Sequence, residues 1–138
     1  MRPLLFLMAL TAAAVVAADR PELNGTWQLS SPHDGRLKFD TLLIQMSEEG
    51  VKITESGAKE KTVDFACAID ATECKLKEGA ISFWYNGPAL VMMETHHNRE
   101  VVTKTRLLAA EDGKSLALEV TRVSPPGPNA TYTFKKQP

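Results

Sequence analysis

The stretch Asn24-Gly25-Thr26-Trp27-Gln28-Leu29 determines how the rest of the chain has to be arranged. Its tryptophan lies in the first strand-like run, and an indole of that size needs contacts from several distant elements to be buried. The segments that follow therefore have to pack around Trp27 and bury it. Their alternation of apolar and polar residues predicts that these segments are β-strands.

The residues before this stretch have the layout of a secretory signal peptide. A short basic start precedes an uncharged apolar run from Leu4 to Val16, and the small residue Ala18 ends the segment before Asp19. The apolar run is shorter than the roughly 20 residues of a membrane span, which argues against an uncleaved anchor. We expect residues 1–18 to be a signal peptide and residues 19–138 to be one soluble domain, secreted or periplasmic, without a membrane span.

The size and charge of the chain limit its partners. The chain has 138 residues and a formal net charge of −1. A mature domain of about 120 residues is large enough to bury a core of its own. A balanced charge provides no basic footprint for nucleic acid and no polybasic patch for a membrane surface. We therefore predict no nucleic-acid partner, and partners that are neutral, mixed in charge or apolar.

Short alternating segments separated by turn residues run through the whole mature chain. Glu48-Glu49-Gly50 predicts a hairpin loop ending in glycine, which tolerates the positive φ of a bulge, and Glu111-Asp112-Gly113-Lys114 predicts another hairpin turn. This pattern predicts about eight to ten sequential strands, which favours an up-and-down antiparallel barrel over a sandwich with long crossovers. The strand-like segments are 27–29, 42–47, 51–54, 63–70, 74–77, 81–85, 89–95, 101–108, 116–120 and 131–135.

These features together resemble the lipocalin-like (calycin) barrels, in particular the small exported bacterial ones. The resemblance rests on Gly25-Thr26-Trp27, on the successive hairpins, on the late Asp112-Gly113-Lys114 turn and on the aromatic and basic strand from Tyr132 to Lys136. It implies an all-β fold with a single up-and-down antiparallel β-barrel. In that family the tryptophan closes one end of the barrel under a basic side chain from a late strand. The resemblance therefore assigns structural roles to Trp27 and to Lys135 or Lys136.

The two cysteines of the chain, Cys67 and Cys74, are predicted to form a disulfide. A two-residue turn centred on Asp70-Ala71 would place them directly opposite each other in an antiparallel hairpin, where Cα atoms lie about 4.5 to 5.5 Å apart. In an exported protein, a single pair of cysteines is expected to be oxidised. The bridge would stiffen a hairpin at one rim of the barrel.

Thioether and imidazole side chains raise the question of a copper site. Met92 and Met93 face opposite sides of one strand, and His96 and His97 fall in a turn, so these side chains do not converge with each other or with His33. We therefore predict no metal site and no cofactor.

A letter match to a catalytic motif occurs in Ser56-Gly57-Ala58-Lys59, which fits Ser-x-x-Lys. The match lies in a turn between strands, where no helix presents the lysine to the serine. The chain has no Gly-x-Ser-x-Gly, no His-Glu-x-x-His and no phosphate-binding loop. We therefore predict that the protein is not an enzyme and has no catalytic residues.

The apolar alternation supplies the candidate ligand-binding residues. Arg106 shares a strand face with Lys104; if that face points inward, Arg106 could hold a ligand carboxylate through a bidentate fork. If it points outward, both side chains are solvated, which the cost of burying an unpaired charge favours. The candidate set is Met46, Phe65, Phe83, Tyr85, Leu90 and Arg106, and its apolar members are equally well explained as core.

The fold resemblance predicts an exported, non-enzymatic protein that binds a small apolar ligand, although one fold hosts many functions. The alternative is a protein-interaction module, such as a protease or hydrolase inhibitor, that uses the loops 30–36 and 124–128. A third hypothesis is a structural envelope protein. A ligand binder needs a lumen of about 300 Å³ or more, whereas an inhibitor tolerates a packed interior. Asn24-Gly25-Thr26 and Asn129-Ala130-Thr131 both fit the glycosylation sequon.

Overall fold

The computed structural model describes residues 20–32, 34–57, 62–96 and 98–138. The expected signal peptide lies outside these residues, as do His33, His97, Ala58 and Lys59 of the motifs considered above. The described part contains ten strands and no helix long and apolar enough to cross a membrane. The strands are β1 (Gly25–Leu29), β2 (Thr41–Ser47), β3 (Gly50–Ser56), β4 (Val63–Cys67), β5 (Cys74–Leu76), β6 (Gly79–Asn86), β7 (Ala89–His96), β8 (Val101–Ala109), β9 (Ser115–Ser124) and β10 (Ala130–Lys136).

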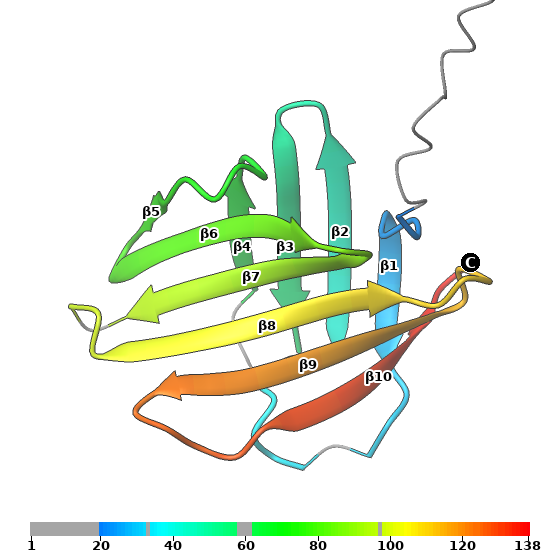
Figure 1. Cartoon of the computed structure of the whole chain (residues 1–138). Coiled ribbons are helices and arrows are strands. Elements are labelled where there is room, and N and C mark those ends of the chain that lie inside the picture. The colour runs from blue at the N-terminus through cyan, green and yellow to red at the C-terminus, as the bar shows by residue number, and fades with distance from the viewer. Residues whose placement is uncertain (1–19, 33, 58–61, 97) are drawn as a thin grey trace, which may run out of the picture.

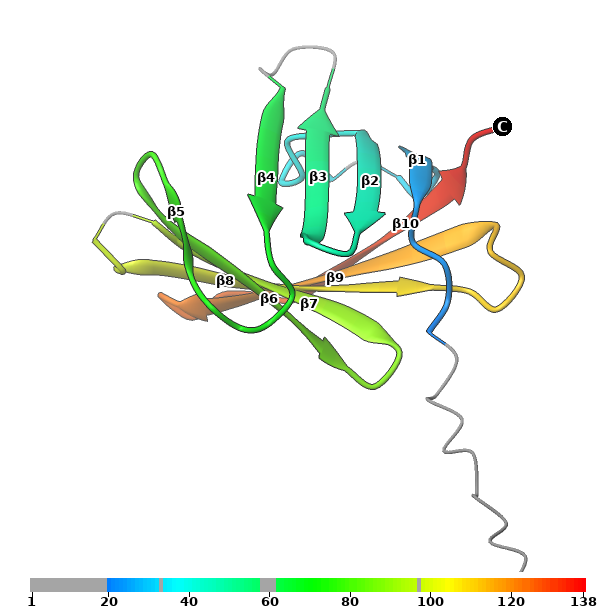
Figure 2. The same cartoon turned by 90° about the horizontal axis from the view of Figure 1, so that it is seen from above.

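The ten strands form one antiparallel sheet that curls into a nearly closed barrel (Figure 1). Strands that follow each other in sequence are neighbours from β1 to β4 and from β5 to β10, and β1 also pairs with β10. The predicted all-β, up-and-down antiparallel barrel is confirmed. In the view from above, β1 to β4 form one layer and the strands β6 to β9 form a second layer that faces it (Figure 2).

The barrel is interrupted between β4 and β5, which are the two ends of the strand order. Within the described residues β4 pairs only with β3, and β5 pairs only with β6. The predicted hairpin from residue 67 to residue 74 is therefore wrong. Its physical reason lies in the connecting loop, where the Ala71 backbone N–H donates to the Phe83 carbonyl of β6 at 2.9 Å, so that the chain moves towards β6 instead of folding back on β4.

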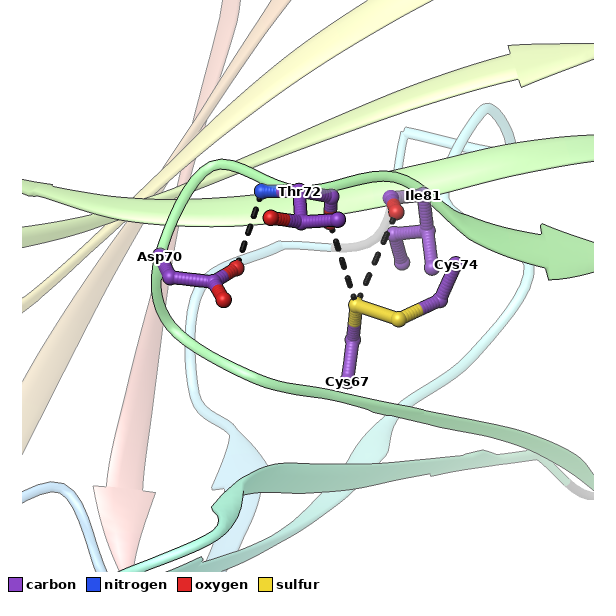
Figure 3. Close-up of a disulfide and its surroundings, with 5 residues drawn as sticks. All are labelled: Cys67, Asp70, Thr72, Cys74 and Ile81. Atoms are coloured by element: carbon purple, nitrogen blue, oxygen red, sulfur yellow. Dashed lines mark hydrogen bonds between the residues drawn. A yellow bond between two sulfur atoms is a disulfide. The ribbon is translucent and has the colours of Figure 1, made fainter.

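The predicted disulfide is present at this interruption (Figure 3). Cys67 is the last residue of β4 and Cys74 is the first residue of β5, with their Cα atoms 5.9 Å apart. The Thr72 backbone N–H donates to Asp70 Oδ1 at 2.9 Å, which stabilises the tight loop between the two cysteines. The bridge thus ties together two edge strands that share no ladder hydrogen bonds, and it does not reinforce a hairpin.

Trp27 lies fully buried near one end of the barrel. Its indole Nε1–H donates to the Leu23 carbonyl at 2.9 Å, and the Lys136 ammonium lies 5.6 Å from the ring centroid. Lys136 pairs in register with Trp27, whereas Lys135 pairs with Gln28, so of the two lysines considered it is Lys136, and not Lys135, that lies over the indole. We call this region the Trp27 end of the barrel.

The segment 30–40 between β1 and β2 crosses the opposite end of the barrel, which we call the mouth. The Ser30 backbone N–H donates to the Thr133 carbonyl at 2.8 Å, and the Tyr132 hydroxyl donates to Asp34 Oδ2 at 2.8 Å. Leu37 in the same segment is buried in the core. The segment is therefore held against β10 and covers part of the mouth.

Candidate ligand-binding site

The five apolar residues predicted to line a site belong to the interior of the barrel. Phe83 and Leu90 are fully buried and Phe65 is nearly so, while Met46 and Tyr85 are partly buried against the same core. Met46 and Tyr85 also border a small cavity of about 200 Å³ beside the N-terminal segment 20–24. The other three side chains pack into the core and do not line this cavity.

Arg106 does not belong to the interior. Its neighbours Thr105 and Leu107 are buried, so Arg106 between them points to the outer face, where its Nη1 lies 2.8 Å from Glu119 Oε2 of β9. The pair is partly exposed, so its charges stay in contact with water, while the Arg106 Nε–H is buried and has no hydrogen-bond partner among the described residues. Arg106 is therefore corrected from a candidate ligand-binding residue to a member of a surface ion pair.

A larger cavity of about 440 Å³ lies at the mouth of the barrel. One wall is the 35–38 part of the segment between β1 and β2, and the other is formed by β8, β9, β10 and the loop before β10. Apolar groups and positively charged groups share the lining. The lining residues are Gly35, Arg36, Leu37, Lys38, Thr103, Val120, Arg122, Pro128, Ala130 and Tyr132.

Three cationic side chains face this cavity, and they differ in how they are paired. Arg36 is bound by Asp34, with Nη2 and Oδ2 3.0 Å apart. Two hydrogen bonds with Arg36 and one from Tyr132 lower the pKa of Asp34 to about 2. Lys38 and Arg122 have no ion-pair or hydrogen-bond partner among the described residues. The cavity therefore has a surplus of positive charge.

The position of Arg122 is set by the local register of β9. β9 pairs with β8 in an unbroken register from Leu116 to Arg122, which lies opposite Thr103, so ordinary strand alternation puts Arg122 on the side of Val120. A bulge follows only after Arg122, where Val102 lies opposite Ser124. The stem of Arg122 lies over Gly127, where an added Cβ would come within 2.9 Å of its Cδ. Gly127 thus leaves the space in which the guanidinium reaches the cavity.

Sequence reasoning missed Arg122 and also missed an acidic group inside the barrel. Glu94 continues the inward alternation of Leu90 and Met92, and its Oε2 lies 3.0 Å from Nε2 of His96. Burial, together with the negative charge of Glu94, raises the pKa of Glu55 to about 8. The signal was the alternation itself, since Glu55 follows Val51 and Ile53 at every second position of β3.

This acidic group does not form a recognisable metal centre. Across residues 20–138, apart from the few positions that the structure leaves undescribed, no three His, Cys, Asp or Glu side chains converge as metal ligands. Met92 is buried in the core and Met93 lies on the other side of β7, as the alternation predicted. The mouth cavity therefore combines hydrogen-bonding and charged groups with an apolar floor.

Comparison with known proteins adds the structural class. No family model matches the chain, and no curated protein matches its sequence. Secretory abundant heat soluble protein 4 from Ramazzottius varieornatus superposes with a TM-score of 0.68 at 15% identity, over 88% of this chain and 98% of that one. Fatty-acid-binding protein 1 from Echinococcus granulosus gives a TM-score of 0.65 at 15% identity, over 84% and 98% of the two chains.

A second secretory abundant heat soluble protein from R. varieornatus gives a TM-score of 0.67 at 11% identity, over 88% of this chain and 99% of that one. At these identities the neighbours establish the fold alone. The fold is a calycin, or lipocalin-like, β-barrel, which agrees with the resemblance in the sequence. None of the three structures is described as bacterial, and a bacterial source stays a prediction.

Proposed function

We propose that this chain is an exported, non-enzymatic binding protein for a small amphipathic ligand that has an apolar body and an anionic group. The observation that carries the proposal is the mouth cavity of about 440 Å³, which presents the unpaired Arg122 beside an apolar floor. Its volume lies in the range of about 300 to 1,000 Å³ that small-molecule sites occupy. The neighbouring fatty-acid-binding protein shows that a barrel of this shape is compatible with such a role.

The charges of the lining favour an anionic over a cationic ligand group. Arg36 is neutralised by Asp34, but Lys38 and Arg122 keep their charge. A guanidinium offers two parallel N–H groups to a carboxylate or phosphate, and such charge-assisted pairs are the stronger hydrogen bonds in proteins. The apolar side chains of Leu37, Val120 and Ala130 would cover the body of the ligand.

The two loops that the inhibitor hypothesis assigned to a protein partner, 30–36 and 124–128, can instead serve the binding of a small ligand. Segment 30–36 is tied to β10 by the Asp34–Tyr132 hydrogen bond, and Pro128 of the loop before β10 lines the cavity. Both loops therefore border the same cavity and shape its walls. Export is part of the proposal, and the disulfide supports it because such bonds persist in oxidising compartments.

The test measures binding of three amphiphiles with the same dodecyl chain but different head groups: dodecanoate, dodecanol and dodecyltrimethylammonium. Titration calorimetry, below the critical micelle concentrations of the two ionic amphiphiles and below the solubility limit of dodecanol, should rank the carboxylate first. Arg122→Ala should weaken dodecanoate binding about tenfold, or about 1.4 kcal/mol, by removing the charged partner. Arg106→Ala, an arginine on the outer face, is the matched control and should leave the affinity unchanged.

Two results would overturn the proposal. One is equal affinity for all three head groups, since the positive lining would then contribute nothing. The other is dodecanoate binding that Arg122→Ala and Arg106→Ala weaken to the same extent, because the ligand would then lie away from the mouth cavity.

A further inference from the structure

The two glycosylation sequons of the chain lie in contrasting surroundings. Asn129 is exposed in the loop between β9 and β10, and its side chain makes no hydrogen bond with any residue that the structure describes. Thr131, which completes its sequon, is exposed at the start of β10, opposite Glu119. Both groups that define an acceptor site are therefore accessible in the folded chain.

Asn24 is engaged in the fold instead. Its Oδ1 accepts a hydrogen bond of 2.6 Å from the Met46 backbone N–H, and its own backbone N–H donates to Glu22 Oε1 at 3.0 Å. The next residue, Gly25, has a φ of 135° and leaves space for the side chain of Lys136. The Trp27 indole donates a hydrogen bond to the carbonyl of Leu23, the residue directly before Asn24. A saccharide on Asn24 would therefore disturb the segment that covers Trp27.

Asn129 lies next to the mouth cavity. Pro128 and Ala130 on either side of it line the cavity, whereas Asn129 does not. Asn129 is exposed in the loop before β10, so its side chain is accessible beside the cavity and is not part of the lining. A glycan there would stand on the rim of the mouth without filling the ligand site.

We propose that Asn129 is an N-glycosylation site and that Asn24 is not used in the folded protein. The co-reactant is a lipid-diphosphate-linked oligosaccharide, and the transfer is catalysed by the oligosaccharyltransferase of a secretory compartment. Asn129 Nδ2 attacks the anomeric carbon of the sugar, and the carbon–oxygen bond to the phosphate breaks. The lipid diphosphate leaves with the electron pair while Nδ2 loses one proton, which gives an N-glycosyl amide.

The test expresses the full chain in insect cells, once with its own N-terminus and once with residues 1–18 replaced by an established secretion leader. The secreted protein is weighed intact, then treated with peptide-N-glycosidase in heavy-oxygen water, which converts each glycosylated asparagine to a labelled aspartate. We expect the label on Asn129 alone. Asn129→Gln and Thr131→Ala should abolish the glycan mass, and Asn24→Gln should leave it unchanged.

The outcomes separate the site from the export that it requires. Glycosylation with the established leader but not with the native N-terminus supports the site and rejects export by residues 1–18. A secreted protein without glycan behind the established leader, or a label on Asn24, overturns the proposal. The glycosylated and enzyme-treated forms should also bind dodecanoate within about twofold of each other, and a tenfold difference would refute the position of Asn129 outside the lining.

Discussion

Removing the Cys67–Cys74 disulfide should destabilise the barrel at its interruption. The bridge closes a loop with a sequence separation of 7, for which the chain-entropy relation gives about 2.4 kcal/mol at 25 °C. Unfolding entropy of roughly 2.1 cal/mol/K per residue amounts to about 0.25 kcal/mol/K for about 120 residues. The melting temperature should therefore fall by about 10 °C when the bond is absent.

The loss should also be local, because no ladder hydrogen bonds join β4 to β5 when the bridge is gone. Hydrogen exchange should accelerate in Val63–Cys67 and Cys74–Leu76, while the amides of β8 and β9 in the continuous part of the sheet keep their protection relative to global unfolding. A disulfide inside a hydrogen-bonded hairpin would give a smaller local change, since the ladder would remain after reduction.

The assay compares thermal unfolding and hydrogen exchange of the oxidised protein, the reduced protein and the Cys67→Ala/Cys74→Ala variant. The reduced wild type is the control for lost side-chain volume, because Cys67 is buried and alanine is smaller. The reasoning fails if the reduced protein melts within about 2 °C of the oxidised one. It also fails if the exchange of β4 and β5 does not change, even where the melting temperature does.

Two further perturbations test the Trp27 end and the acidic interior. Trp27→Ala should lower the free energy of unfolding by about 3 to 5 kcal/mol in denaturant titrations, whereas Lys136→Met, which removes only the cation over the ring, should cost about 1 kcal/mol or less; equal losses would contradict the central role of the indole. Because the pKa of Glu55 is raised to about 8, the folded protein keeps a proton that the unfolded carboxyl releases near its ordinary 4.5, so stability should fall as the pH rises from about 4.5 to about 8. Glu55→Gln should remove this fall and melt above the wild type at pH 9, and parallel pH profiles of the two proteins would contradict the assignment.

The strand order was predictable from local turn chemistry wherever a turn joins two paired strands. A turn between β2 and β3 was predicted at Glu48-Glu49-Gly50 and is present, although it is one residue shorter, because Gly50 already pairs with Ser47 as the first residue of β3. The connection from Cys67 to Cys74 was not predictable in the same way. Its length suits both a hairpin and a loop between two separate edges, and a Cα distance within disulfide range is compatible with either. The alternation of apolar and polar residues predicts which face of the sheet a side chain lies on, but it does not predict which strand pairs with which.

The candidate site shows the same limit of the pattern. Phe65 and Phe83 were assigned to the interior, but a packed core and the lining of a cavity give an identical alternation, and the structure places both in the core. Arg122 follows Leu116, Leu118 and Val120 at every second position, and it was missed because the expected strand ended at residue 120. The sequence signal for the mouth site was therefore a charged residue that continues the alternation of inward-facing apolar residues.

Strand β8 separates the negative charge of Glu94 from the positive charge of Arg122. Glu94 of β7 lies opposite Thr103 of β8, and Thr103 lies opposite Arg122 of β9, so the three residues form one row across the sheet. Strands lie about 4.8 Å apart, which puts the backbones of Glu94 and Arg122 roughly 10 Å from each other. Glu94 and Arg122 form no ion pair with each other among the described residues, and two charges about 10 Å apart in water attract each other by less than about 1 kcal/mol. Arg122 therefore keeps its charge available for a ligand, and the carboxylate beyond Thr103 repels an anionic group that moves too far towards β7.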